Sequence, residues 1–138
     1  MNHTPQVLRD AASLINEHGL YTGEQFVGPD GSYDLVAAIY QAGARILPGA
    51  FRTDAAAAIA FIKGCKRAMD AIRAFYTTLQ AAYPEAHDDD EVIDTVSVWA
   101  EKGDWGPDQQ PPTTSEIIGR LLRAAEALET QDSTTLAA

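Results

Sequence analysis

Residues 53–79, TDAAAAIAFIKGCKRAMDAIRAFYTTL, form the stretch that decides how the rest of the chain is arranged. Apolar residues recur in it at steps of three and four, which places them on one stripe of a helix. The members of the stripe are Phe61, Cys65, Ala68, Met69, Ile72, Phe75, Tyr76 and Leu79. We therefore predict one long amphipathic helix, capped by the Thr53 hydroxyl, against which shorter elements pack.

Gly64 lies in the middle of this predicted helix, where a glycine costs roughly 1 kcal/mol relative to alanine. Because the residue has no side chain, a second helix could cross closely at this point. The alternative is a kink, or a break into two helices, at Gly64. We favour the single helix and keep the break as the competing interpretation.

Four shorter helices are predicted around this element, each bounded by capping or breaking residues. They cover residues 4–18, 33–47, 88–101 and 113–128. Between the first two, residues 20–32 (LYTGEQFVGPDGS) carry turn signals and predict a small hairpin or an ordered loop. The sum is a mainly α protein, a compact bundle of about five helices in one domain over residues 1–128. Residues 129–138 are expected to form a flexible tail.

The chain has 138 residues, 20 of them acidic and 10 basic, which gives a formal net charge of −10. This balance argues against nucleic acid and anionic membranes as partners, because both require clustered cations. The sequence contains no apolar run near the ~20 residues of a membrane span and no signal peptide at its start. A single cysteine excludes an intramolecular disulfide, so we expect a cytoplasmic protein.

The charges are unevenly distributed along the chain. Residues 45–73 carry six basic residues against two acids, whereas residues 85–108 carry nine acids against Lys102. The predicted contact surface consists of Lys63, Lys66, Arg67 and Arg73 on the long helix and of Asp88, Asp89 and Asp90 at the start of a later helix. We expect these two groups to meet, in the same chain or in a partner. Alternatives for the basic side are a solvated helix face and, as a third function, nucleic-acid binding.

No catalytic, metal or cofactor motif accompanies these charges. The acidic run at 87–94 lacks the spacing of a calcium-binding loop, and acids gather at a helix start because the helix dipole favours them. Whether the run binds a cation stays open. The three histidines and Cys65 are not spaced as zinc ligands, and Cys65 fits a small buried apolar residue. We expect no metal, no cofactor and no catalytic residue.

Trp105 lies in a loop rich in glycine and proline, where an aromatic residue can serve as a binding anchor or can cover the last helix. This loop also supports an alternative function, a small-molecule-binding protein or a small enzyme. Its pocket would lie between residues 20–32 and 104–112 and would use Tyr21, Glu24 and Asp104.

Two segments resemble a family of small uncharacterised helical proteins from bacteria and phages. They are residues 8–26, LRDAASLINEHGLYTGEQF, and residues 96–126, VSVWAEKGDWGPDQQPPTTSEIIGRLLRAAE. The insertion at residues 102–112 departs from the shorter spacing of that family. The resemblance implies a bacterial or phage accessory protein and carries no activity with it.

The leading hypothesis is a non-enzymatic helical protein-interaction module. Such a module would associate with itself, as a homo-oligomer, or bind a protein partner as an accessory or structural component. The uneven charge, the lack of catalytic motifs and the loop tryptophan motivate this hypothesis.

Overall fold

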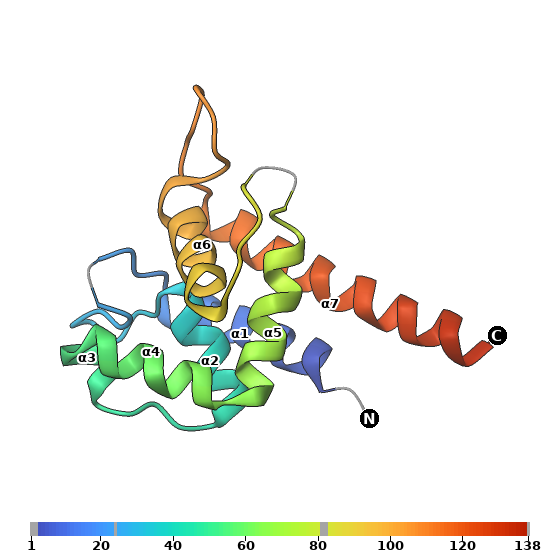
Figure 1. Ribbon diagram of the computed structural model, residues 1–138. Helices are drawn as coiled ribbons and strands as arrows, with labels where there is room; N and C mark the ends of the chain where they lie inside the picture. The colour runs from blue at the N-terminus through green and yellow to red at the C-terminus, as the bar shows by residue number, and fades with distance from the viewer. Residues whose placement is uncertain (1–2, 24, 81–82, 138) are drawn as a thin grey trace.

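A computed structural model describes residues 3–23, 25–80 and 83–137, with side chains as far as residue 131. The helices within these ranges are α1 (Thr4–His18), α2 (Leu35–Ala44), α3 (Ala50–Thr53), α4 (Ala55–Gly64), α5 (Lys66–Thr77), α6 (Asp89–Lys102) and α7 (Thr114–Ala137). The protein is mainly helical, as predicted (Figure 1). None of these helices combines the length and the apolar character needed to cross a lipid bilayer.

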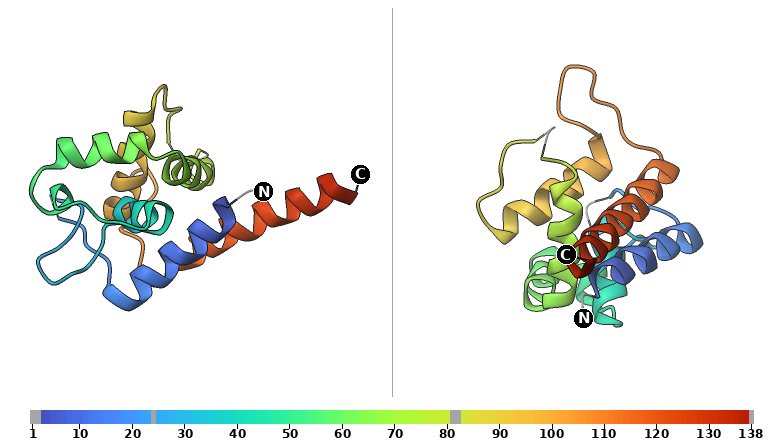
Figure 2. Two further views of the ribbon diagram at one scale, coloured as in Figure 1. Left: turned by 90° about the horizontal axis from the view of Figure 1, so that it is seen from below. Right: turned by 90° about the vertical axis from the view of Figure 1, so that its right-hand side faces the viewer.

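Helix α2 lies at the centre of the fold, and all its residues except Gln41 and Ala44 are buried. Helix α1 packs against α2 on one side and along α7 on another (Figure 2). Helix α5 closes the core by contacting α1, α2, α6 and α7. The side chains that fill the centre and expose no surface are Leu8, Ile15, Leu35, Ile39, Ile72, Phe75, Ile117 and Leu121.

The predicted long helix is wrong, because residues 53–79 contain the end of α3, the whole of α4 and the whole of α5. The cap of α4 is Asp54 rather than Thr53, and its carboxylate accepts a hydrogen bond of 3.1 Å from the backbone N–H of Ala57. The chain breaks at Cys65, whose φ of −104° and ψ of 105° are those of extended backbone. Helices α4 and α5 therefore point in different directions (Figure 1), and the alternative of a break beside Gly64 is confirmed.

The close helix crossing occurs at Gly43 of α2 and not at Gly64. A Cβ atom on Gly43 would lie 3.0 Å from the backbone nitrogen of Ala68, in the first turn of α5. A Cβ atom on Gly64 would meet nothing within 4 Å. The turn at Cys65 lets α5 lie directly against α2, which a straight continuation of α4 does not provide. Shared periodicity in α4 and α5 conceals this change of direction in the sequence.

Residues 19–23 and 25–34 belong to an ordered loop rather than to a hairpin. Tyr33 makes isolated bridges with Leu20 and Val27, and the backbone N–H of Asp34 donates a hydrogen bond of 2.9 Å to the Phe26 carbonyl. The turn at residues 28–32 is closed by Asp30, whose carboxylate accepts hydrogen bonds from the backbone and hydroxyl of Ser32. These bonds fold the loop back onto the start of α2.

Capping bonds fix the starts of α6 and α7 as the sequence predicted. The Asp88 carboxylate accepts a hydrogen bond of 2.9 Å from the Glu91 N–H, and the Thr113 hydroxyl accepts one of 3.1 Å from the Glu116 N–H. Residues 129–137, expected as a tail, continue α7 as helix. The helix extends beyond the body of the protein, where Arg9 of α1 pairs with Glu129 (Figure 2).

Candidate functional site

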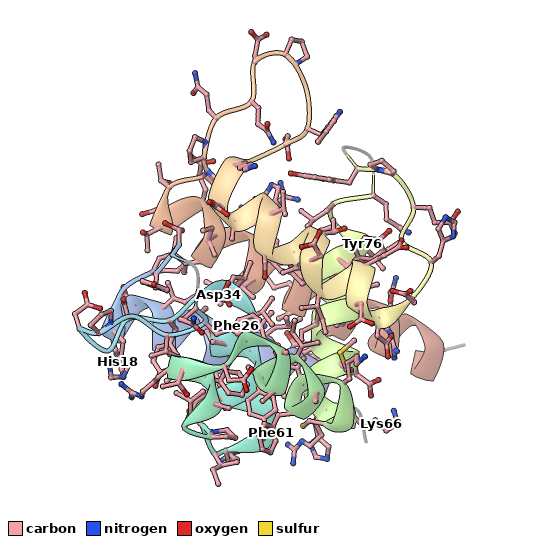
Figure 3. All side chains as sticks on the ribbon, turned by 60° about the vertical axis from the view of Figure 1, so that its left-hand side comes forward. His18, Phe26, Asp34, Phe61, Lys66 and Tyr76 are labelled. Atoms are coloured by element: carbon pink, nitrogen blue, oxygen red, sulfur yellow. The ribbon has the colours of Figure 1, made fainter. Side chains whose placement is uncertain are left out.

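Helix α4 is apolar around its circumference, a composition typical of a helix covered on every side. One side is covered, since Ile62 exposes no surface. The other side faces solvent, where Ala56, Ala60 and Phe61 are exposed and Phe61 keeps 47% of its surface accessible. Figure 3 shows Phe61 pointing away from the body of the protein. The structure therefore leaves an apolar helix face open.

This open face borders a groove of about 790 Å³ between the end of α2, the outer side of α4 and the start of α5. We call it the Phe61 groove. Its apolar lining includes Tyr40, Ala44, Ala57, Ala60, Phe61 and Cys65. Arg45 and Arg67 also border it, and both are exposed. The groove thus combines an apolar floor with two guanidinium groups.

The two arginines of the groove are held by the backbone and keep their charges available. Arg45 ends α2 in the left-handed conformation, with φ of 65°, and its N–H donates a hydrogen bond of 2.9 Å to the Gln41 carbonyl. Arg67 lies in the first turn of α5. Within the described part of the chain, neither side chain forms an ion pair.

The other predicted basic residues are paired with carboxylates of the same chain. Lys63 Nζ lies 3.1 Å from Asp90 Oδ1, and Arg73 pairs with Asp89. Lys66 pairs with Asp70 one turn further along α5, at 2.7 Å. The contact predicted between the basic residues and the start of α6 is therefore formed within one chain.

This pairing within the chain limits the charge that the predicted residues can offer a partner. Asp88 is occupied as the cap of α6, and Asp89 and Asp90 hold α6 against α5 and α4. Exposed ion pairs of this kind contribute about 0–1 kcal/mol each to stability, so their main effect is to cancel charge. Arg67 is the one member of the predicted basic surface that the described structure leaves uncompensated.

The loop at residues 103–112 presents Trp105 to solvent. Trp105 is 68% exposed and forms an edge contact with the Tyr83 ring, at a centroid distance of 6.4 Å. It does not cover α7. Asp104 accepts a hydrogen bond of 3.0 Å from the indole nitrogen of Trp99, which is buried under Arg120. Asp104 therefore supports the base of this loop.

The pocket predicted between residues 20–32 and 104–112 is not formed by the described residues. The two loops lie apart (Figure 1), and they line separate cavities. Tyr21 packs over the backbone of its own loop, within reach of Gly23 and Gly28. Asp104 lies at the other loop, and Glu24 lies outside the described residues. The cause is the backbone pairing that folds the first loop onto α2.

A cavity of about 380 Å³ does form beside this first loop, between the starts of α2 and α4 and the inner side of α6. We call it the Asp34 cavity. Asp34 caps α2 by accepting a hydrogen bond of 2.9 Å from the Ala37 N–H. Burial raises the pKa of the Asp34 carboxyl to about 7, with a smaller contribution from Glu101 in the same direction. The N–H groups of Ala37 and Val36 and the nearby Ser97 hydroxyl oppose this rise.

Among the described residues, no three histidine, cysteine, aspartate or glutamate side chains are placed so that they could hold one metal ion. The acidic residues at the start of α6 are spread over a cap and two ion pairs. Cys65 is half-buried at the break between α4 and α5.

The sequence of residues 1–127 matches the family of unknown function DUF6197. The chain belongs to this family. No curated protein and no solved structure is significantly similar to it. Membership in DUF6197 accounts for nearly the whole helical body, including both cavities, and the family description assigns neither of them a ligand.

Sequence reasoning missed the most distinctive residues of this DUF6197 protein. Phe61 was placed on the core stripe, although Ile62, its neighbour, takes the buried position. The signal that could have revealed the open face is the all-round apolarity of residues 55–62. Asp34 lies near the start of the helix predicted over residues 33–47, but its burial depends on α4 and α6, which lie far away in sequence.

Proposed function

We propose that this protein is a non-enzymatic helical interaction module that binds a partner helix in the Phe61 groove. The observation that carries this proposal is the exposure of Phe61 on an apolar helix face beside a groove flanked by Arg45 and Arg67. We further propose that it acts in the cytoplasm of a bacterium, or with a phage, as an accessory or structural component, on the resemblance of its two terminal segments to such proteins.

The physical chemistry of the groove favours a helix as occupant. Ala57, Ala60 and Gly64 are small residues, which allow the backbone of a second helix to approach α4 closely. Phe61 supplies an aromatic anchor beside them, and anchors of this kind dominate binding energies at interfaces. Burying the remaining half of its surface is worth about 2 kcal/mol at ~25 cal/mol per Å².

The charges indicate which helix fits. Arg45 and Arg67 flank the apolar floor without carboxylate partners in the described chain, so a complementary helix carries acidic residues beside its apolar stripe. We commit to an acidic amphipathic helix of a partner protein. A second copy of this chain, which is itself strongly acidic, is the alternative occupant.

Two designed peptides with the same apolar stripe, one flanked by glutamates and one by lysines, test this proposal by fluorescence titration. The acidic peptide should bind at least about tenfold more tightly. Phe61→Ser should weaken it by about tenfold or more, as loss of an anchor does. Arg67→Glu should remove the preference for the acidic peptide, whereas Arg52→Glu, an equal charge change on α3 outside the groove, should preserve it.

Sedimentation velocity of the protein alone identifies the alternative occupant. A dimer that disappears in Phe61→Ser and persists in Arg52→Glu assigns the groove to a second copy. A monomer that binds neither peptide overturns the proposal, as does binding of both peptides with equal affinity.

A second candidate function, small-molecule binding, is favoured by one specific observation. The Asp34 cavity places polar side chains in a partly enclosed space beside the 20–32 loop. The alternative expected from sequence thus moves to different residues, and its ligand chemistry is developed next.

A further inference from the structure

The Asp34 cavity lies on the inner side of α4, away from the Phe61 groove. Figure 3 shows Asp34 and Phe26 together between α4 and α6, with Phe61 on the far side of α4. One wall is apolar and includes Phe26, Ile59 and Ile93. The remaining polar lining comes from Gln25, Asp34, Asp90, Asp94 and Ser97. The cavity is therefore divided into an apolar part and an acceptor-rich part.

Two oxygen atoms of this lining accept no hydrogen bond from the described residues. Gln25 Oε1 and Ser97 Oγ are both withdrawn from solvent, although the Ser97 hydroxyl is near enough to the Asp34 carboxylate to act on its pKa. Buried polar atoms in native proteins are almost always satisfied by a protein group, a water molecule or a ligand. Gln25 Oε1 is an amide oxygen that can only accept, so it calls for a hydrogen-bond donor, and the Ser97 hydroxyl can accept from the same donor while its own proton is directed to a carboxylate.

The charged groups around the cavity favour a cationic donor. Three carboxylates line it, from Asp34, Asp90 and Asp94, and no basic side chain does so. Lys63 approaches from α4 but pairs with Asp90. The N-termini of α2 and α6 add partial positive charge, which their own capping carboxylates already offset. The lining thus offers acceptors and negative charge beside an apolar wall.

We propose that the Asp34 cavity binds a primary ammonium group carried on a short apolar body. The ammonium group brings three donors and no acceptor, so it can serve Asp34, Gln25 Oε1 and Ser97 Oγ together. The hydrocarbon part lies against Phe26, Ile59 and Ile93. The same chemistry is found in a free alkylamine and in a lysine side chain of another protein.

The protonation of Asp34 couples to this binding. Burial holds the pKa of Asp34 near 7, and an ammonium group beside it would lower that pKa by favouring the carboxylate. Asp90 and Asp94 from α6, Glu101 further along α6 and Lys63 from α4 are the other charges that act on the site. Binding is therefore expected to strengthen as pH rises through about 7.

Titration of the whole chain with n-butylammonium, followed by the backbone and side-chain amide signals in NMR, tests the proposal. The neutral n-butanol, of similar size, is the ligand control. Butylammonium should shift the signals of Gln25, Asp34 and Ser97, and butanol should bind at least about tenfold more weakly because it lacks the charge-assisted bonds. A capped lysine serves as the second source, and tighter binding of it than of butylammonium assigns the site to a lysine side chain.

Variants separate the cavity from general charge attraction. Asp34→Asn keeps the cap of α2, because asparagine caps helices as well as aspartate, and should weaken butylammonium about tenfold or more. Ser97→Ala should weaken it without unfolding the protein. Asp108→Asn removes the same charge in the 103–112 loop and should leave affinity unchanged. Equal binding of butanol, equal effects of Asp34→Asn and Asp108→Asn, or no binding of either amine at millimolar concentration overturns the proposal.

Discussion

The two sides of α4 border cavities of opposite character. Ala55 and Ile59 face the Asp34 cavity, whereas Ala57, Ala60 and Phe61 face the Phe61 groove. At about 100° per residue these two sets lie on opposite sides of the helix. The inner cavity is partly enclosed and lined by carboxylates, and the outer groove is open, apolar and flanked by arginines.

This difference shows that the charged groups lining the two cavities come from the helices that lie beside α4 and not from the residues of α4 itself. On the inner side α6 brings Asp90 and Asp94, and Asp90 pairs with Lys63 of α4. On the outer side the ends of α2 and α5 bring Arg45 and Arg67. The apolar residues of one helix therefore border two cavities of different charge.

The largest expected effect is the loss of stability when a buried side chain of α4 is truncated. Ile62→Ala should lower the free energy of unfolding by about 2–5 kcal/mol, because it leaves a cavity at a fully buried position. Phe61→Ala, one residue earlier, should cost less than about 1 kcal/mol because half of Phe61 is already in solvent. Urea unfolding of both variants measures the contrast.

Which of the two substitutions lowers the free energy of unfolding more tests which side of α4 faces the core. If Phe61→Ala destabilises the protein as much as Ile62→Ala, the outer side of α4 is covered in solution. A dimer that buries the Phe61 groove would give this result, and dilution would then reduce the difference.

The second expected effect is a change of the free energy of unfolding with pH, caused by Asp34 on the inner side of α4. Asp34 has a pKa of about 7 in the folded protein and an ordinary value of 3.8. Between these values the folded state binds a proton that the unfolded state has released, so stability falls as pH rises and the loss is complete above about pH 7. Three pKa units correspond to at most about 4 kcal/mol. Asp34→Asn should remove this dependence and be more stable than the wild type at about pH 8.

Comparing unfolding of the two proteins at about pH 5 and about pH 8 isolates Asp34 from the other carboxylates. Asp108→Asn is the matched control, because its exposed carboxylate has no buried environment to lose. A stability difference between Asp34→Asn and the wild type that stays the same at both pH values would show that Asp34 is ionised in the folded protein.

Most of the fold follows from local signals in the sequence. The caps at Asp88 and Thr113 and the helix ends at Gly19 and Gly103 depend on residues within one turn of each other, so the sequence reveals them. The break at Cys65 does not, since an unbroken periodicity runs through it. It results from the close packing of α5 on Gly43, a contact between distant segments.

The candidate site was predictable only in part, for the same reason. The pairing of Lys63 and Arg73 with Asp90 and Asp89 followed from charge complementarity, which a sequence displays directly. The exposure of Phe61 depends on which side of α4 the rest of the protein covers. That choice is made by tertiary packing, and periodicity alone places Phe61 and Ile62 equally well inside.

The smallest effect should come from the ion pair between Lys63 of α4 and Asp90 of α6. Lys63 and Asp90 are 40% and 60% exposed, so a double-mutant cycle with Lys63→Gln and Asp90→Asn should give a coupling of about 0.2–1 kcal/mol. The coupling should shrink in about 1 M salt, where the screening length falls to about 3 Å. Because Asp90 also lines the Asp34 cavity, Lys63→Gln frees a carboxylate and should strengthen butylammonium binding. A coupling that is large and insensitive to salt would contradict an exposed pair and would place α6 more tightly over α4.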